Sequence, residues 1–127
     1  MTSVPYVLLV DDHAETLGGM EEIFSAAGFA VVAATGADQA VDAIGQSVPP
    51  GLIVTDLDMP YTSGWDFLKY LREDLVLRHV PVIVTTGRAV DSRTIADVIL
   101  SKPIDPHVLI AEARRLMGIG PNRLPIP

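Results

Sequence analysis

Three acidic side chains follow apolar runs at two points of the chain. Asp11 and Asp12 come directly after residues 6–10, and Asp56 comes directly after residues 52–55. Continuous apolar runs of this length are typical of fully buried strands. Because an unpaired buried carboxylate costs several kcal/mol or more, these acids need a counter-charge, a metal ion or solvent in a cleft. Their positions therefore predict a chemical site at the carboxyl ends of two strands.

A divalent metal ion and a phosphoryl group fit these acids. Clustered carboxylates repel one another, and Mg²⁺ removes the repulsion while it binds one or two carboxylates together with phosphate oxygens. A carboxylate such as Asp56 can attack phosphorus and form an acyl phosphate. Two later apolar runs end in Thr85-Thr86 and in Lys102, so a threonine hydroxyl and an ammonium group are available for the transferred oxygens. The combination predicts Mg²⁺-dependent phosphoryl transfer to Asp56.

Alternating strand and helix patterns are expected to bring these groups together. Apolar runs predict five strands, over residues 6–10, 29–34, 52–55, 81–86 and 98–100. Helical spacing predicts helices over residues 15–27, 38–46 and 65–72, a short helix over 91–96, and a last helix from the N-cap Asp105 to Gly118. The alternation predicts a flavodoxin-like α/β fold, which is a doubly wound, five-stranded parallel sheet of order 2-1-3-4-5 with helices on both faces. The fourth helix is expected to be short or irregular, and ligands are expected at the carboxyl ends of the strands.

Length and composition predict one domain without a nucleic-acid or membrane role. The 127 residues are 49% hydrophobic, enough for one core, and the net charge of −7 disfavours direct binding to a polyanion. No apolar run approaches the length of a membrane span, and cysteine is absent, which fits a reducing compartment. We therefore expect a soluble, cytoplasmic domain over residues 1–118, followed by a proline-containing tail over residues 119–127.

Four motifs together resemble a known family. The segments VLLVDDH, LIVTDLDMP, PVIVTTG and SKP occur in this order at the ends of the predicted strands. Over residues 5–118 they resemble the receiver domain of response regulators in bacterial two-component systems. The resemblance implies that Asp56 is the phosphoacceptor, that Asp12 binds Mg²⁺ directly, and that Asp11 binds it mostly through water. It also implies that the backbone carbonyl of Asp58 is a further Mg²⁺ ligand.

The same resemblance assigns roles to the later motifs. Thr86 rather than Thr85 would be the switch hydroxyl, because a small residue follows it as in the family. Lys102 would contact the phosphoryl group, and the Lys102-Pro103 peptide would be cis. The chain departs from the family at Ile99, where receivers typically carry an aromatic residue, and in the short segment between the threonine and the lysine. We expect retained phosphoryl chemistry with a remodelled signalling face, as in some stand-alone receivers and some receiver segments of hybrid histidine kinases.

The expected function is signalling through a phosphorylated aspartate. A histidine kinase or a histidine phosphotransfer domain would donate the phosphoryl group, and hydrolysis would later remove it from Asp56. Such a domain is a signalling module rather than a turnover enzyme. Only a short tail stands after the last helix in this sequence, so we expect output through contacts with an unknown protein target, unless the chain is a fragment of something longer. Two alternatives stay open: a haloacid-dehalogenase-like phosphatase, which the order Asp56-Leu57-Asp58 also resembles, and a partner-binding pseudo-receiver.

Two further predictions concern charged side chains near the acids. Arg88 is expected to pair with Asp58 across the mouth of the pocket and to slow hydrolysis of the acyl phosphate. His13, His79 and His107 show no metal-ligand spacing, so they are expected to be solvated and to have no chemical role.

Overall fold

The strands form one parallel sheet whose order is the predicted one. The computed structural model describes residues 5–46, 48–59, 64–87 and 96–119. Within these residues the sheet order is β2-β1-β3-β4-β5, and every neighbouring pair of strands is parallel. The strands are β1 (Tyr6–Val10), β2 (Ala30–Ala34), β3 (Leu52–Asp56), β4 (Val82–Thr86) and β5 (Val98–Ser101).

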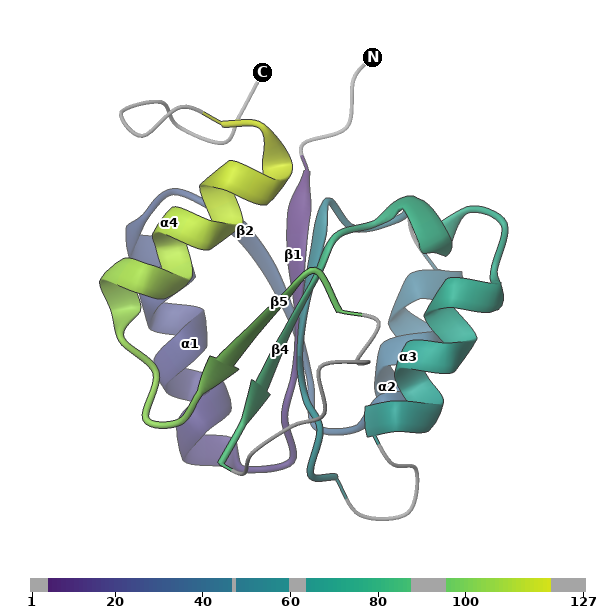
Figure 1. Cartoon of the computed structure of the whole chain (residues 1–127), viewed down its shortest axis with the longest axis horizontal. Helices are drawn as coiled ribbons and strands as arrows, with labels where there is room; N and C mark the ends of the chain where they lie inside the picture. Colours follow the sequence, from purple (N-terminus) through teal and green to yellow (C-terminus); the bar gives the residue numbers. More distant parts are fainter. Residues whose placement is uncertain (1–4, 47, 60–63, 88–95, 120–127) are drawn as a thin grey trace.

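Helices cover both faces of the sheet, as a doubly wound fold requires (Figure 1). The helices α1 (Ala14–Ala26) and α4 (Pro106–Met117) lie on one side, and α2 (Ala37–Gly45) and α3 (Gly64–Glu73) lie on the other. A short 3-10 helix, η1 (Leu77–His79), leads into β4. Within the described residues, no helix is both long and apolar enough to cross a membrane.

The central strands β1, β3 and β4 are buried along their whole length. Their side chains alternate between two apolar layers: Leu8 belongs to the layer of Phe67 on α3, and Leu9 belongs to the layer of Phe24 on α1 and Leu109 on α4. Strands that are covered on both faces need apolar side chains at every position, which explains the continuous apolar runs. The buried polar residues of β3 and β4 all lie in the last two positions of each strand. The polar groups therefore gather at one edge of the sheet.

Local signals set the ends of the last helix. Its N-cap is Asp105, whose carboxylate accepts a 2.8 Å hydrogen bond from His107 N, and a proline occupies the first turn. Gly118 ends the helix with a φ of 69°, a left-handed conformation that glycine adopts without strain. Both ends are as predicted. The predicted second strand is one residue too long, because Phe29 packs edge to face on Phe24, with ring centroids 5.3 Å apart, instead of extending β2.

Some predictions concern residues outside the described ranges. They are the short helix over residues 91–96, of which only Ala96 is described, the pairing of Arg88 with Asp58, and the tail beyond Ile119. Gly87, Ala96 and Asp97 flank the stretch between β4 and β5 and belong to neither a helix nor a strand. The short helix expected over residues 91–96 therefore stays a prediction.

Candidate functional site

The carboxyl ends of three strands bring two acids and one cation together. Asp11 follows β1, Asp56 ends β3, and Lys102 follows β5. The Lys102 ammonium nitrogen lies 3.1 Å from Asp11 Oδ2 and 3.4 Å from Asp56 Oδ2. The backbone of Lys102 is held against β4 by a 2.8 Å hydrogen bond from its N–H to Thr86 O, and the Lys102-Pro103 peptide is cis, as expected. Segments far apart in sequence thus share one ion-pair network at the predicted edge of the sheet.

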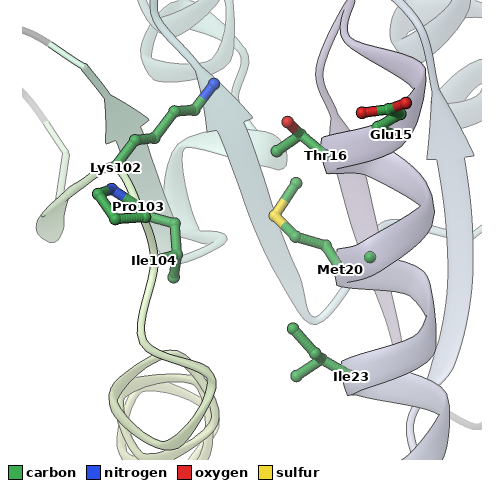
Figure 2. A pocket seen from close by; sticks show the side chains of 8 residues that line it. Glu15, Thr16, Met20, Ile23, Lys102, Pro103 and Ile104 are labelled. Atoms are coloured by element: carbon green, nitrogen blue, oxygen red, sulfur yellow. The ribbon is translucent and has the colours of Figure 1, made fainter.

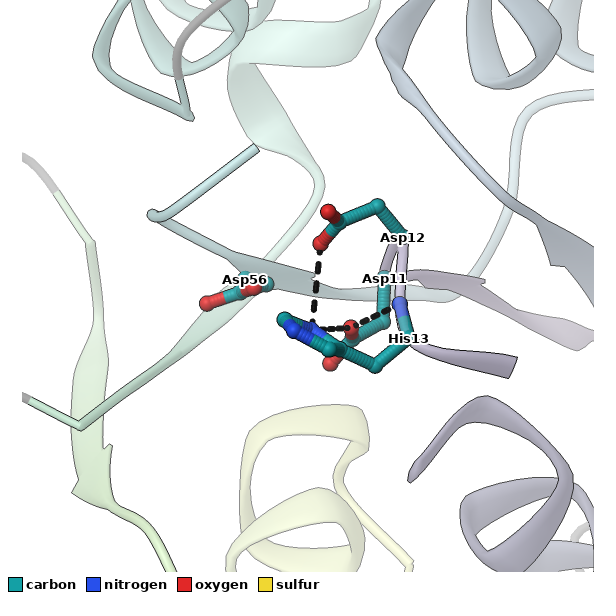
Figure 3. A group of neighbouring side chains, drawn as sticks. All are labelled: Asp11, Asp12, His13 and Asp56. Atoms are coloured by element: carbon teal, nitrogen blue, oxygen red, sulfur yellow. Dashed lines mark hydrogen bonds and ion pairs between the residues drawn. The ribbon is translucent and has the colours of Figure 1, made fainter. Parts of the chain in front are cut away.

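Asp12 and His13 extend this network at the end of β1 (Figure 3). His13 Nδ1 lies 3.2 Å from Asp11 Oδ1 and 3.2 Å from Asp12 Oδ1. One possible ligand atom from each of Asp11, Asp12, His13 and Asp56 lies within 4.8 Å of the others. The three acids of this cluster are predicted from the sequence, and His13 is solvated, as expected. Its side chain is 64% exposed, yet its ring turns back onto the acids.

The Asp56 carboxylate is fully buried, and its two oxygens differ. Oδ1 accepts a 3.1 Å hydrogen bond from Asp58 N, whereas Oδ2 faces Lys102 and accepts no hydrogen bond within the described part of the chain. Burial raises the pKa of Asp56, and the charge of Asp11 raises it further. The hydrogen bond from Asp58 and the positive charge of Lys102 only partly offset these effects. The ionised carboxylate is therefore less favourable in the protein than in water, and a bound cation would stabilise it.

Lys102 is the counter-charge that Asp11 and Asp56 share. Burial by itself lowers the pKa of Lys102, but the hydrogen bond to Asp11 and the charges of both acids outweigh it. The pKa of Lys102 is therefore raised overall, and the ammonium stays protonated at neutral pH. The side chain keeps 23% of its surface exposed, so an anion that approaches Asp56 meets a positive charge.

The donor set fits a hard divalent cation. Asp11, Asp12 and Asp56 offer carboxylate oxygens, which are the ligands that Mg²⁺ prefers. Asp12 Oδ1 and Asp56 Oδ2 are buried and accept no hydrogen bond from the described residues, although His13 Nδ1 and Lys102 Nζ lie near them. Buried acceptors in this condition are rare, and a metal ion would satisfy them. Asp58, the fourth predicted metal residue, contacts the site through its backbone, because its N–H donates a hydrogen bond to Asp56 Oδ1.

The two threonines at the end of β4 are placed differently relative to Asp56. In the sheet register Asp56 pairs with Thr85, whereas Thr86 pairs with Ser101 of β5. Both threonines are buried, and Thr85 Oγ1 has no hydrogen-bond partner among the described residues. Consecutive side chains of a strand point to opposite faces, so the two hydroxyls leave β4 in different directions. Thr86, the predicted switch residue, is the last residue of its strand and lies beside the backbone of Lys102.

A cavity of about 530 Å³ lies beside Lys102, between α1 and the segment that follows β5 (Figure 2). Met20 and Ile23 on α1 face Pro103 and Ile104 across it. The other lining residues are Glu15, Thr16 and Gly19. The sequence pattern did not predict this cavity, because the apolar face of the first helix was assigned to the core alone. The apolar lining of the cavity ends at the Lys102 ammonium.

Known proteins of similar sequence are response regulators. The family model of the response regulator receiver domain matches residues 7–114. The response regulator Rre1 of Synechocystis is 34% identical over 119 residues, which cover 88% of this chain and 51% of Rre1. The polar-differentiation response regulator DivK of Brucella ovis is 28% identical over 118 residues, which cover 88% of this chain and 95% of DivK. The chain thus spans about half the length of Rre1 and nearly all of DivK.

Solved structures agree with the sequence comparison. A response regulator receiver protein from Pseudomonas putida is 26% identical, and its structure matches with a TM-score of 0.82 over 91% of this chain and 99% of that one. The acids after β1 and at the end of β3, and the lysine after β5, occur here in the order of the motifs that suggested the family. The chain belongs to the family of response regulator receiver domains of two-component systems.

Proposed function

We propose that this chain is a phosphoacceptor switch in which Asp56 receives a phosphoryl group in a Mg²⁺-dependent reaction. The observation that carries this proposal is the buried Asp56 carboxylate, whose Oδ2 lies 3.4 Å from the Lys102 ammonium in a cluster with Asp11 and Asp12. An oxygen without a hydrogen bond keeps its lone pairs available for attack. Membership of the receiver family supports the same role.

Asp56 Oδ2 is the proposed nucleophile. The hydrogen bond from Asp58 N to Oδ1 orients the carboxylate and directs Oδ2 toward Lys102. Oδ2 would form a bond to phosphorus while the bond from phosphorus to the donor nitrogen breaks, and the donor imidazole would leave with that electron pair. The Lys102 ammonium would stabilise a phosphoryl oxygen at this point. The product is an acyl phosphate on Asp56, which water later hydrolyses.

Asp11, Asp12 and Asp56 are the proposed Mg²⁺ ligands, with the backbone carbonyl of Asp58 as a further one. When bound, Mg²⁺ supplies positive charge to the phosphoryl oxygens. Asp11 also accepts a 3.1 Å hydrogen bond from Lys102 Nζ, so it holds the ammonium in place beside the nucleophile. Asp11 would therefore serve both the metal ion and the lysine.

Thr86 is proposed to respond to phosphorylation. Its hydroxyl would donate to a phosphoryl oxygen, and its carbonyl already accepts the hydrogen bond from Lys102 N. Ile99 of β5, where receivers typically carry an aromatic residue, is 37% exposed on the edge strand of the sheet. We propose that the signal leaves through this edge of the sheet and reaches a protein target.

The proposed donor is a phosphohistidine on a histidine kinase or a histidine phosphotransfer domain. The cavity between α1 and the segment after β5 supports a protein donor, because its apolar lining ends at Lys102. We propose that the exchange takes place in the cytoplasm and that the chain is a signalling module rather than a turnover enzyme. The proposed module covers residues 1–118, and residues 119–127 form the proposed tail.

Phosphorylation by a small donor tests this proposal. The protein is incubated with acetyl phosphate and Mg²⁺, and its intact mass is measured before and after alkali treatment. We expect one alkali-labile phosphoryl adduct in the wild type and none in Asp56→Asn or without Mg²⁺. No adduct in the wild type would favour a partner-binding pseudo-receiver. Sustained phosphate release from several phosphomonoesters would favour a phosphatase.

A further inference from the structure

His13 is the one side chain of the acidic cluster that the proposed function does not use. It stands at the N-cap of α1 and makes no capping hydrogen bond with its side chain. Its backbone N–H donates a 2.9 Å hydrogen bond to Asp11 Oδ1, which fixes the turn between β1 and α1. The imidazole then folds back, so Nδ1 lies 3.2 Å from Asp11 Oδ1 and 3.2 Å from Asp12 Oδ1. A ring nitrogen thus points at the place where two carboxylates converge (Figure 3).

The spacing of the four donors fits a single metal ion. One atom from each of Asp11, Asp12, His13 and Asp56 lies within 4.8 Å of the others. Ligands of one octahedral ion with bonds of about 2.1 Å are about 3 Å apart when adjacent and about 4.2 Å apart when opposite, so small side-chain shifts would close the set. Asp56 is fully buried, and its Oδ2 accepts no hydrogen bond within the described residues. The Lys102 ammonium lies 3.4 Å from this oxygen without a hydrogen bond to it, so the oxygen keeps lone pairs for a metal ion.

The positions of Lys102 and His13 separate two functions of the Asp11 carboxylate. Oδ2 accepts a hydrogen bond from Lys102 Nζ at 3.1 Å, whereas Oδ1 faces His13 Nδ1 at 3.2 Å. The ammonium and the imidazole therefore contact different oxygens of the same carboxylate. Lys102 lies toward Asp56 Oδ2, and His13 lies toward Asp12, the acid proposed as a direct ligand. The imidazole is thus on the side of the cluster assigned to the metal ion.

We propose that His13 is a nitrogen ligand of the ion that Asp11, Asp12 and Asp56 bind. This proposal rests on the proposed metal site and adds a preference to it. Imidazole suits first-row ions such as Co²⁺, Ni²⁺ and Zn²⁺, whereas Mg²⁺ prefers oxygen ligands. His13 therefore biases this site toward imidazole-binding ions, relative to a receiver site made of oxygen ligands alone. In this role Nδ1 presents its lone pair to the ion, and Nε2 is the ring nitrogen that carries the proton.

A different role for His13 predicts the opposite effect. If the imidazole only donates hydrogen bonds to the carboxylates, it neutralises part of their charge and competes with every divalent cation. Its removal would then tighten the binding of Mg²⁺ and Co²⁺ alike. A ligand role predicts weaker Co²⁺ binding and nearly unchanged Mg²⁺ binding when His13 is replaced. The sign of the change in Co²⁺ affinity distinguishes the two roles.

The test compares Co²⁺ and Mg²⁺ affinities of the full chain by titration calorimetry. We expect His13→Asn to weaken Co²⁺ binding by about tenfold or more, the loss typical when a metal site loses a supporting group. The visible absorption of bound Co²⁺ is expected to change as well, because a nitrogen ligand is lost. His107→Asn is the matched control, since its Nδ1 lies 3.6 Å from Asp105 Oδ1 at a fully exposed position away from the cluster. It should leave both affinities unchanged.

Two outcomes overturn the proposal. Equal changes in Co²⁺ and Mg²⁺ affinity in His13→Asn would show that the imidazole is no ligand. Co²⁺ binding that survives in Asp12→Asn would place the ion elsewhere. His13→Gln and circular dichroism of each variant separate a metal effect from loss of folding. A wild type that binds both ions through Asp12 but accepts no phosphoryl group would refute the proposed function and leave this inference standing.

Discussion

Replacing Asp56 by asparagine is expected to stabilise the folded domain when no divalent ion is present. The wild-type carboxylate is fully buried, its Oδ2 accepts no hydrogen bond from the described residues, and burial and Asp11 raise its pKa. The gain comes from removing a buried charge, whose desolvation costs about 1–3 kcal/mol or more. An amide keeps an oxygen for the hydrogen bond from Asp58 N and removes the charge. The lost attraction to Lys102 is the smaller effect, because all interactions together raise the pKa.

The magnitude and its pH dependence follow from these contacts. We expect Asp56→Asn to raise the free energy of unfolding by about 1–3 kcal/mol at pH 7. Below the unfolded-state pKa of 3.8 the wild-type carboxyl is protonated in both states, so the two proteins should differ little. As the pH rises through the raised folded-state pKa, the wild type loses stability relative to the variant, and the difference is complete above that pKa.

Urea unfolding in the presence of a chelator measures the difference directly. Wild type and Asp56→Asn are compared at about pH 3.5 and about pH 7, which bracket the titration of Asp56. If the slopes of the two urea curves agree, a common slope converts the difference in midpoints into a difference in the free energy of unfolding. Asp42→Asn, at an exposed position of α2, is the control and should change stability little at either pH. A variant less stable than wild type at pH 7 would refute the reasoning, as would a stability difference independent of pH.

Three further predictions concern groups outside the metal cluster. Arg72 donates to two backbone carbonyls around η1 and to Asp97 Oδ2 at 3.0 Å. Urea titration should therefore show a loss of about 1–3 kcal/mol in Arg72→Ala and a smaller loss in Asp97→Asn; a wild-type midpoint in Arg72→Ala would contradict this. Hydrogen bonds from two backbone N–H groups at η1 lower the pKa of Asp74, so its contribution is present above pH 3.8 and is lost as the pH falls through the lowered pKa. Asp74→Ala should flatten the acid side of the stability curve, and curves parallel to wild type would exclude this contribution. Thr85→Val removes a buried hydroxyl without a partner among the described residues, so it should raise the free energy of unfolding by about 1 kcal/mol and with it the melting temperature. A lower melting temperature would reveal a partner that the hydroxyl needs.

The fold could be predicted because its central strands are buried on both faces. Leu8 and Leu9 enter opposite apolar layers, so β1 has no polar position to interrupt the run. The same requirement made the site recognisable in the sequence, since a carboxylate such as Asp56 at the end of such a strand has no role in packing. The boundary of β2 was less predictable. Phe29 suits a strand by residue type, but its contact with Phe24 decides its place.

The geometry of the site could be predicted only where strand ends determine it. Asp11 follows β1 and Lys102 follows β5, and the carboxyl ends of these parallel strands lie at the same edge of the sheet, with β3 and β4 between them. The topology therefore places both residues at that edge, and the long lysine side chain reaches Asp11 from there. The place of His13 depends instead on a local hydrogen bond from its own N–H to Asp11, which spacing alone does not reveal.

The identity of the phosphorylated residue is the most direct test of the central claim. The adduct formed with acetyl phosphate and Mg²⁺ is reduced with borohydride, which converts an aspartyl acyl phosphate into homoserine, and the digested protein is sequenced by tandem mass spectrometry. We predict homoserine at Asp56 alone, next to unmodified Asp11, Asp12 and Asp58. Homoserine at any of those three positions, or none anywhere in a protein that carries the adduct, would contradict the assignment of Asp56 as the phosphoacceptor.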